Sequence, residues 1–473
     1  MLPLMLIFIL LHLLLSPAIA IHDDVPLSKE TKLLFLNKLQ WNLNHVWLPH
    51  PPQRSRTVEG TTVLEMKLTK PREADDVLKF LMSDDARVSS LQFRIRNRSN
   101  ESAQDGSSME VQIPLSSGVT LQTLNYVVAV ELGGRKMTVI VDTGSDLTWV
   151  QCKPCTSCYN QQDPVFDPSA SPSYRNIPCN SPTCDSLPLA TGNSGVCSTD
   201  EQSCSYSLSY GDGSYSHGVL SSESINLGGT LVKNFIFGCG ESNQGLFGGT
   251  SGLMGLGRTQ LSLVSQTAFQ FGGVFSYCLP ASEFDSSGSL VLGSNSSVYR
   301  NSTPIVYTRL ISDPLQGPFY YLNLTSISVG GMALQASGFS NGRILIDSGT
   351  VITRLVPSIY RALRDEFVKQ FSGFSPAPAF SILDTCFNLT GYTEVSVPTL
   401  RLQFEGEVEL DVDATGVLYF VQKDASQVCL ALASLLYEDE TTIFGNYQQK
   451  NLRIVYDTAG NRLGFAEEAC GYN

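Results

Sequence analysis

The chain has 473 residues, of which only 16% are charged, and a formal net charge of −13 at pH 7. This length can bury a large core in more than one domain or lobe, and the 39 glycines favour many strands and turns over long charged helices. Residues 21–110 hold equal numbers of basic and acidic side chains, so the excess of carboxylates lies in the rest of the chain. An acidic body does not suggest nucleic-acid binding. It suits a protein that acts at low pH and a leader that is held partly by charge.

The first element, residues 1–20, is predicted to be a signal peptide. Its sequence, MLPLMLIFILLHLLLSPAIA, has no charged side chain and ends in the small-x-small pattern Ala18-Ile19-Ala20, which is typical of a cleavage site. An uncleaved membrane anchor is the alternative, and the missing basic region before the apolar run favours it. The cleavage pattern and the twelve cysteines favour removal. We therefore expect entry into the secretory pathway and no membrane attachment after cleavage.

Residues 21–117 are predicted to form a pro-segment. The stretch DDVLKFLMSDDARV, Asp75–Val88, is expected to be helical. The later stretch NRSNESAQDGSSME, Asn97–Glu110, is polar and is expected to be flexible and cleavable. We therefore expect the leader to be removed between Ser90 and Gly118.

The next apolar run, VIVDTGSDLTWV (Val139–Val150), ends in an aspartate that Thr-Gly-Ser follows directly. A carboxylate that activates water needs a second carboxylate facing it. The stretch GRILIDSGTVITRL (Gly342–Leu355) supplies one, because it places Asp347 in the same context as Asp142. Each copy follows a Gly-Gly hairpin signal, and the two aspartates lie 205 residues apart, the length of a lobe.

This repeat predicts two similar lobes, an N-terminal lobe over 118–300 and a C-terminal lobe over 301–473, each of which contributes one acid. A second repeated element supports the duplication. GLMGLG (Gly252–Gly257) and TIFGNY (Thr442–Tyr447) each place two apolar residues before a glycine. A glycine there lets another backbone segment approach closely.

The chemistry of paired carboxylates accounts for these residue types. Two carboxylates held close together cannot both ionise easily, so they share one proton. The charged member can take a proton from water while the neutral member donates one to a substrate carbonyl. Gly144 and Gly349 permit the tight turns that expose the acids. The hydroxyls of Ser145 and Thr350 can hydrogen-bond the outer carboxylate oxygens.

The twelve cysteines predict a disulfide framework in an oxidising compartment. The stretch CKPCTSC, which begins at Cys152, could instead bind a metal. However, His217 is the only histidine beyond residue 50 and a second CxxC is missing, so a disulfide-bonded loop is the better interpretation. We expect His217 on the surface, because no G-x-S-x-G motif accompanies it for a Ser/His/Asp mechanism. Six N-x-S/T sequons agree with secretion: Asn97, Asn100, Asn295, Asn301, Asn323 and Asn388.

Together these motifs resemble the pepsin family of aspartic endopeptidases, and more closely its plant nepenthesin-like branch. The matching stretches are VDTGSDLTWVQCKPC, YGDGSYSHG, FGCGESNQG, IDSGT, IFGNYQQK and VYDTAGNRLGFA, and they extend over residues 123–473. The resemblance implies an all-β, two-lobed fold with few short helices and an active cleft between the lobes. It also implies peptide-bond hydrolysis at acidic pH by a monomer without a cofactor. The expected location is extracellular, in the apoplast, with the vacuole as the alternative.

The resemblance also assigns roles to individual residues. Asp142 and Asp347 would be the catalytic pair, and Thr143 and Ser348 would form a hydroxyl–backbone grip beneath them. Tyr210 would lie on a hairpin flap over the substrate, hydrogen-bonded to the indole of Trp149; an ordinary strand aromatic is the alternative. The cysteine-rich insert at 152–204 resembles the one typical of the nepenthesin-like branch. In pepsin-like zymogens a leader of this kind covers the active cleft.

The resemblance suggests a disulfide between Cys386 and Cys429 in the C-terminal lobe. Nine cysteines lie in the N-terminal half and three in the C-terminal half, so full pairing requires an odd number of links between the halves. Cys470 is then left to reach either Cys278 or Cys239, and the sequence does not choose between them. One further helix is expected over SIYRALRDEFVKQFSG, which stops at Gly373.

Two other classes of function are alternatives to a protease. Some plant pepsin-like proteins are catalytically inactive inhibitors or binding proteins, and these typically lose an active-site aspartate or its glycine. Both motifs are whole in this chain, so an active enzyme that acts on polypeptides is favoured. A secreted adhesion or carbohydrate-binding module would not explain two Asp-Thr/Ser-Gly motifs in a duplicated frame.

Overall fold

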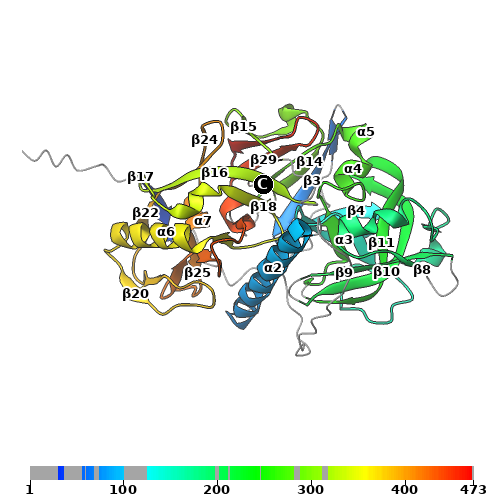
Figure 1. The fold of residues 1–473 in the computed structure, drawn as a ribbon, viewed down its shortest axis with the longest axis horizontal. Coiled ribbons are helices and arrows are strands. Elements are labelled where there is room, and N and C mark those ends of the chain that lie inside the picture. Colours follow the sequence, from blue (N-terminus) through cyan, green and yellow to red (C-terminus); the bar gives the residue numbers. More distant parts are fainter. Residues whose placement is uncertain are drawn as a thin grey trace, which may run out of the picture.

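The computed structural model describes residues 30–36, 56–58, 60–68, 74–100, 125–197, 202–210, 213–245, 247–281, 288–311 and 318–470. These residues form two lobes built mostly of strands, with helix α2 (Ala74–Asn100) between them (Figure 1). The mostly-β, two-lobed fold class predicted from the sequence is confirmed. The predicted signal peptide and residues 101–117 lie outside the described residues.

A 16-stranded sheet forms the N-terminal lobe and continues between the lobes, in the order β15-β30-β29-β13-β14-β3-β4-β5-β12-β6-β11-β10-β9-β8 with β2 and β7 off this path. Its strands are β2 (Arg56–Val58), β3 (Thr61–Leu68), β4 (Tyr126–Leu132), β5 (Arg135–Asp142), β6 (Trp149–Gln151), β7 (Arg175–Asn176), β8 (Val196–Cys197), β9 (Cys204–Ser209), β10 (Tyr215–Leu227), β11 (Thr230–Gln244), β12 (Gly252–Gly255), β13 (Val274–Cys278), β14 (Gly288–Leu292), β15 (Val306–Arg309), β29 (Leu452–Asp457) and β30 (Arg462–Glu467). Three short helices accompany it: α3 (Leu187–Thr191), α4 (Leu263–Gln266) and α5 (Ala268–Phe271).

The C-terminal lobe contains an 8-stranded sheet, in the order β24-β23-β16-β18-β28-β19-β27 with β17 off this path, and a 4-stranded sheet in the order β20-β21-β26-β25. The strands are β16 (Tyr320–Val329), β17 (Met332–Ala333), β18 (Arg343–Asp347), β19 (Thr353–Leu355), β20 (Ser375–Ala377), β21 (Cys386–Asn388), β23 (Leu400–Phe404), β24 (Val408–Asp411), β25 (Leu418–Phe420), β26 (Val428–Leu430), β27 (Leu432–Ser434) and β28 (Thr442–Gly445). Helices α6 (Pro357–Gln370) and α7 (Ala414–Val417) pack beside them. α6 follows the expected period, since Ile359, Leu363 and Phe367 are buried, but it ends at Gln370 and not at Gly373.

The same local arrangement occurs in both lobes where the two aspartates lie. β5 runs parallel to β12 with Asp142 opposite Gly255, and β18 runs parallel to β28 with Asp347 opposite Gly445. A Cβ on Gly255 would lie 2.2 Å from the carbonyl oxygen of Asp146, and one on Gly445 would meet a backbone oxygen at 2.5 Å. Glycine is therefore required at both positions because another backbone segment approaches closely, which is the reason inferred from the repeated pattern.

Strands from three parts of the chain meet in the region between the lobes. β29, from the C-terminal end of the chain, pairs antiparallel with β13, and β14 pairs antiparallel with β3 of the leader. The last strands of the chain therefore extend the sheet of the N-terminal lobe. A boundary at residue 300 divides the sequence, but the two halves share this sheet.

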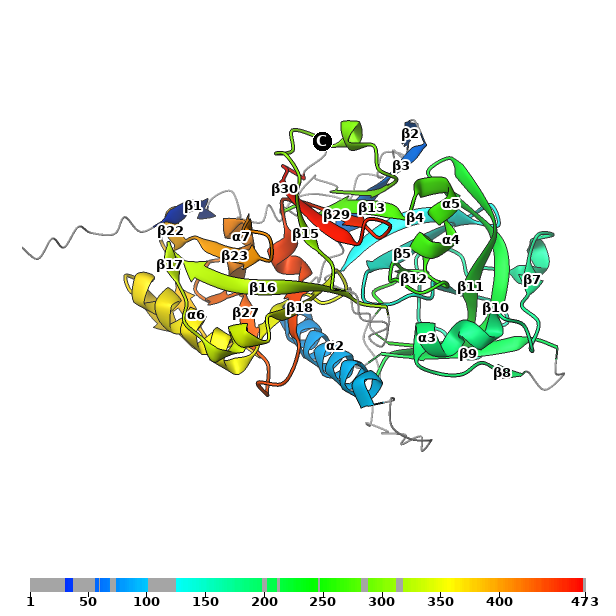
Figure 2. The same cartoon turned by 45° about the horizontal axis from the view of Figure 1, so that its top comes forward.

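Three described segments of the leader contact the rest of the chain. β1 (Thr31–Phe35) pairs with β22 (Glu394–Pro398) at the edge of the C-terminal lobe, and β3 lies within the shared sheet. α2 lies between the lobes in both views, and the second view shows β1 at the far edge of the C-terminal lobe, well away from α2 (Figure 2). The leader therefore contributes strands to the fold as well as a helix between the lobes.

Helix α2 is longer than the predicted helix over Asp75–Val88. Leu81 and Val88 are buried within that range, and Leu91 and Ile95 continue the same face beyond it. An apolar stripe at intervals of three to four residues is what a helix buries, so the helix extends as far as the stripe does. The prediction that Asn97–Asn100 is flexible was therefore wrong, since these residues form the last turn of α2.

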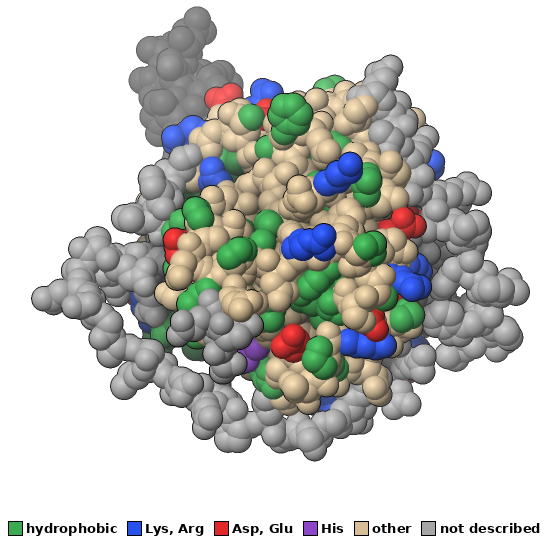
Figure 3. All heavy atoms as spheres, turned by 90° about the vertical axis from the view of Figure 1, so that its right-hand side faces the viewer, with side chains coloured by type: hydrophobic (Ala, Val, Ile, Leu, Met, Phe, Trp, Pro, Cys, Tyr) green, Lys and Arg blue, Asp and Glu red, His purple; other side chains and the backbone are tan. Residues whose placement is uncertain are grey.

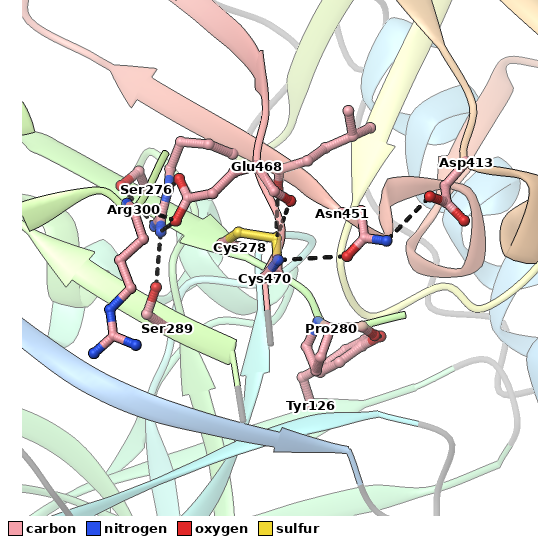
Figure 4. Close-up of a disulfide and its surroundings, with 12 residues drawn as sticks. Tyr126, Ser276, Cys278, Pro280, Ser289, Arg300, Asp413, Asn451, Glu468 and Cys470 are labelled. Carbon is pink, nitrogen blue, oxygen red and sulfur yellow. Dashed lines mark hydrogen bonds and ion pairs between the residues drawn. A yellow bond between two sulfur atoms is a disulfide. The ribbon is translucent and has the colours of Figure 1, made fainter. Parts of the chain in front are cut away.

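All twelve cysteines form disulfides. Cys470 pairs with Cys278, one of the two partners left open by the sequence, and the bond joins the end of the chain to β13 (Figure 4). Cys386 pairs with Cys429 within the C-terminal lobe. The other four bonds lie in the N-terminal lobe and its insert: Cys152–Cys239, Cys155–Cys158, Cys179–Cys197 and Cys184–Cys204.

Candidate active site

The carboxylates of Asp142 and Asp347 lie at the ends of β5 and β18, and both residues are fully buried. Each is held by the same two kinds of donor. For Asp142, the Gly144 N–H donates to Oδ1 at 3.1 Å and the Ser145 hydroxyl donates to Oδ2 at 2.6 Å. Two corresponding donors serve Asp347, the N–H of the glycine two residues later, at 2.9 Å, and the hydroxyl of Thr350, at 2.6 Å. The two lobes therefore hold their acids in equivalent environments.

A reciprocal pair of hydrogen bonds links the two motifs. The backbone N–H of Ser348 donates to the Thr143 hydroxyl at 2.9 Å, and the backbone N–H of Thr143 donates to the Ser348 hydroxyl at 3.1 Å. The Ser348 hydroxyl in turn donates to the carbonyl of Val141 at 3.0 Å. This is the grip that the family resemblance implied, and it fixes the spacing of the lobes directly beneath the two acids.

The glycine of each motif is required by the acid of the other lobe. A Cβ on Gly144 would lie 2.7 Å from Oδ1 of Asp347, and a Cβ on Gly349 would lie 2.3 Å from Oδ1 of Asp142. Any side chain at either position would push the opposite carboxylate away. The Asp-Thr/Ser-Gly pattern is therefore a requirement of the paired geometry as well as of each turn.

The guanidinium of Arg87, from helix α2 of the leader, contacts both acids. Its Nη2 donates to Oδ1 of Asp142 at 2.7 Å and to Oδ2 of Asp347 at 3.0 Å, and its Nε donates to Asp347 at 3.2 Å. One cation thus neutralises much of the charge of two buried carboxylates, which burial would otherwise penalise strongly. The same cation fills the space between them.

The two acids differ in their affinity for a proton. Burial is the largest influence on Asp142 and raises its pKa above the ordinary value, although Arg87 acts in the opposite direction. Burial would also raise the pKa of Asp347, but Arg87 together with the donors Thr350 and Gly349 outweighs it and holds that pKa below the ordinary value. A pair of unequal acids of this kind can hold a single proton between them.

One turn before Arg87, the leader makes a second polar contact with the C-terminal lobe. The carboxylate of Asp84 accepts hydrogen bonds from the backbone N–H groups of Val351, at 2.6 Å, and Ile352, at 3.2 Å. Its Oδ2 also lies 3.0 Å from Nη2 of Arg354, a side chain that is 1% exposed. Burial raises the pKa of Asp84, with Arg354 acting in the opposite direction.

Tyr210 and Trp149 lie beside the aspartates on the N-terminal lobe. The indole N–H of Trp149 donates to the Tyr210 hydroxyl at 2.8 Å, the contact that the resemblance implied. Phe247 packs edge-on against both rings, at centroid distances of 4.9 and 5.7 Å. His217 is exposed on β10 and stacks on Tyr215, in agreement with the surface position expected for it.

Three charged residues near the acids were not predicted from the sequence: Asp84, Arg87 and Arg354. Asp84 and Arg87 lie within the helix that the sequence predicted, and their spacing of three residues places them on one face. Asp84 falls on the stripe of buried positions in α2, which is the signal that could have found it, whereas the Arg87 side chain is 16% exposed and lies off that stripe.

Within the described ranges, no cluster of His, Cys, Asp and Glu could hold a metal ion, and no helix is long and apolar enough to cross a membrane. On the outer face of the N-terminal lobe, basic and acidic side chains are interspersed without a continuous patch of either sign (Figure 3).

Two lobes that each bring one Asp-Thr/Ser-Gly turn to a shared centre define the class of aspartic proteases. The family model described as xylanase inhibitor N-terminal matches residues 126–294, and the one described as xylanase inhibitor C-terminal matches residues 319–467. An Arabidopsis thaliana aspartyl protease family protein is 43% identical, over 85% of this chain and 84% of its own. The aspartic proteinase nepenthesin-1 of Nepenthes gracilis is 35% identical, over 73% of this chain and 78% of its own. The chain belongs to the plant pepsin-like aspartic proteases.

Solved structures share the fold at lower identity. Basic 7S globulin from soybean matches with a TM-score of 0.57 and 20% identity, over 73% of this chain and 92% of its own. The protein edgp matches with a TM-score of 0.59 and 20% identity, over 72% and 91%. At this identity the likeness concerns the fold alone.

Proposed function

We propose that the chain is a secreted aspartic endopeptidase, made as a zymogen, that hydrolyses peptide bonds in acid through water activated by Asp142 and Asp347. The observation that carries this proposal is the equivalent environment of the two carboxylates. Each accepts a hydrogen bond from the glycine N–H two residues later and another from the hydroxyl three residues later. An inactive relative has no need for two matched acids.

The closeness of two buried carboxylates supports a division of labour between them, because they cannot both ionise easily. In the uncovered enzyme one carboxylate is ionised and accepts a proton from water, while the other is protonated and donates to the oxygen of the scissile carbonyl. The oxygen of water then attacks the carbonyl carbon to give a tetrahedral intermediate. Return of a proton to the leaving nitrogen breaks the peptide bond.

The leader blocks this chemistry in the full chain. The Arg87 guanidinium lies where water and the scissile carbonyl must lie, within hydrogen-bond distance of both carboxylates. Activity therefore requires α2 to leave, and cleavage between Ser90 and Gly118 would release it. Residues up to Asn100 are helical, which disfavours cleavage before that residue.

The test is hydrolysis of a denatured protein at pH 3–5 by the purified protein after its leader has been removed in acid, with and without pepstatin. We expect pepstatin-sensitive cleavage that fades toward neutral pH and that EDTA does not reduce. Asp142→Asn and Asp347→Asn should each abolish cleavage. Asp167→Asn, at an exposed carboxylate, is the matched control and should retain it.

An inactive inhibitor or binding protein would release no peptides at any pH, and that result would overturn the proposal. Appreciable acid activity in either dyad variant would overturn the mechanism.

The proposed location, outside the cell or in the vacuole, rests on the pattern of residues 1–20 and on six disulfides, which suit an oxidising compartment. Cell fractionation with N-terminal sequencing of the mature protein tests it.

A further inference from the structure

The contact between Asp84 and the C-terminal lobe has the chemistry of a carboxylate-binding site. Two backbone N–H groups, those of Val351 and Ile352, converge on the Asp84 carboxylate, and a guanidinium adjoins it. Backbone donors and arginine are the groups that proteins commonly use to bind carboxylates. In the full chain the leader itself supplies the carboxylate.

Departure of α2 would leave this site without its anion. Among the described residues, the ion pairs of Arg354 are those with Asp84 and Asp85, and both acids belong to α2. Nη1 of Arg354 remains bonded to the carbonyl of Ile352 at 3.0 Å, whereas Nε and Nη2 donate no hydrogen bond within the described part of the chain. A cation and two converging backbone donors would then lack an anionic partner, so the uncovered site could bind a new carboxylate.

The surroundings of the site strengthen its attraction for an anion. Val351 and Ile352 belong to an apolar cluster that includes Leu383 and Ala433, and Leu81 of α2 packs into the same cluster. Apolar walls lower the local dielectric, so a charge pair there is stronger than one on an exposed surface.

The carboxylate-binding site lies close to the place of the scissile bond. Asp84 precedes Arg87 by three residues in a helix, a rise of about 4.5 Å, and Arg87 occupies the place of the reacting groups. Val351 follows Asp347 by four residues in the same turn. A carboxylate at Arg354 and a peptide bond at the two aspartates can therefore belong to one extended substrate, within a few residues of each other.

We propose that Arg354, with the N–H groups of Val351 and Ile352, forms a substrate subsite that selects an aspartate or glutamate side chain close to the scissile bond. This inference rests on the proposed protease function and adds a class of substrate to it. Asp84 holds the subsite in the zymogen as a substrate carboxylate does in the active enzyme. Arg354 is then a specificity-determining residue.

The experiment uses the full chain after activation in acid and a set of matched peptides of one sequence. Glutamine is replaced by glutamate at one position at a time, on both sides of the scissile bond, and kcat/KM is measured at pH 5. A free glutamate, with a pKa of about 4.3, is mostly ionised there. We expect glutamate to raise kcat/KM about tenfold at one position, because a hydrogen bond to a charged group is stronger than one to a neutral group.

Variants of Arg354 assign the preference to this residue. Arg354→Met should bring the glutamate-to-glutamine ratio to about one at that position while the glutamine peptide is still cleaved, and Arg354→Lys should keep part of the preference. Cleavage of all peptides by the wild type with a ratio near one at every position would overturn the subsite and leave the protease function intact. Failure to cleave any peptide would instead overturn the proposed function on which the inference rests.

A second measurement does not depend on the choice of peptide. In the full chain, Asp84→Asn should speed self-activation about tenfold, because it removes the charge that Arg354 binds. Ser89→Ala, on the exposed face of α2, is the matched control and should not change the rate. If Asp84→Asn speeds activation equally in an Arg354→Met background, the two residues are not coupled and the proposal is wrong.

Discussion

Thr143 and Ser348 hold each other through two reciprocal hydrogen bonds, in which the backbone N–H of each donates to the hydroxyl of the other. Both residues are fully buried and lie next to Asp142 and Asp347 in the sequence. Because the acids belong to different lobes, this pair of bonds helps to fix their separation by linking the two turns directly. The separation in turn determines whether the acids can share a proton.

Loss of either hydroxyl should therefore reduce both stability and rate. Ser348→Ala and Thr143→Val each leave a buried N–H without its acceptor, which costs about 1–3 kcal/mol of unfolding free energy. We expect kcat to fall about tenfold or more in each, and the double variant to lose less than the sum, since both changes break one network. Ser348→Thr keeps the hydroxyl and should behave as the wild type. Thermal unfolding and steady-state kinetics check these outcomes, and additive losses would contradict the coupling.

Arg87 should set how easily the leader is released. Arg87→Met removes hydrogen bonds to two carboxylates, each worth about 1.5 kcal/mol or more, so self-activation should be at least tenfold faster than in the wild type. Arg96→Met changes the same residue type on the same helix, where the side chain is 53% exposed, and should leave the rate unchanged. The rate of appearance of the shortened chain after acidification is the measurement. Equal rates for wild type and Arg87→Met would show that the contact does not hold the leader.

The effect of Arg87 should also depend on pH. The pKa of Asp347 is held below its ordinary value of 3.8, so the contribution of this acid to the covered state is present above 3.8 and is lost as the pH falls through its lower pKa. The raised pKa of Asp142 acts in the opposite sense, because uptake of a proton relieves the penalty of burying its charge. We therefore expect the activation rates of Arg87→Met and wild type to differ most above pH 3.8 and to converge below it. A constant ratio across this range would contradict the assignment.

Trp149 should report on the flap in the processed enzyme. Of the three tryptophans, the other two lie in the leader at positions 41 and 47, so the mature chain would keep Trp149 alone. Tyr210→Phe removes the acceptor of the buried indole N–H of Trp149. We therefore expect altered fluorescence together with a fall of about tenfold in kcat/KM. Tyr215→Phe, on the same hairpin, is the control and should change neither. Unchanged fluorescence in Tyr210→Phe would show that the hydrogen bond is absent in the uncovered enzyme.

The two acids and their donors could be predicted because the chemistry is local and occurs twice. Asp142, Gly144 and Ser145 lie within four consecutive residues, and the second lobe repeats the same types in the same order. The glycines of β12 and β28 could be predicted for the same reason. A repeated pattern restricts the geometry even before the fold is known.

The contacts of the leader could not be predicted, because they depend on how separate parts of the chain dock. Arg87 follows two acidic residues in a helix, a pattern that usually indicates a solvated surface. Arg354 lies in a strand, and only the docking of α2 shows that Asp84 covers it. The pairing of β1 with β22 likewise joins residues more than 350 positions apart in the sequence, beyond the reach of local patterns.

The bond between Cys278 and Cys470 offers the last prediction, because it closes a much longer loop than the bond between Cys155 and Cys158. The sequence separations are 192 and 3 residues. A cross-link restricts the unfolded chain more as its loop lengthens, so replacing both cysteines of the long-range pair by serine should lower the unfolding free energy by about 2–4 kcal/mol. The same replacement at Cys155 and Cys158 should have a much smaller effect.

Other contacts around Cys470 should limit the effect on activity of losing the Cys278–Cys470 bond. Nearby, Arg453 and Glu468 form a fully buried ion pair at 2.8 Å, and the Cys470 N–H donates to Asn451, whose amide donates to Asp413 (Figure 4). β29 also pairs with β13 along five residue pairs, a contact made by the backbone and not by the sulfurs. We therefore expect the serine variant to keep most of its kcat at low temperature and to lose activity several degrees below the wild type. Peptide mapping without reductant verifies the bond, and a thermal midpoint equal to that of the wild type would show that the ion pair and the strand pairing alone hold the end of the chain.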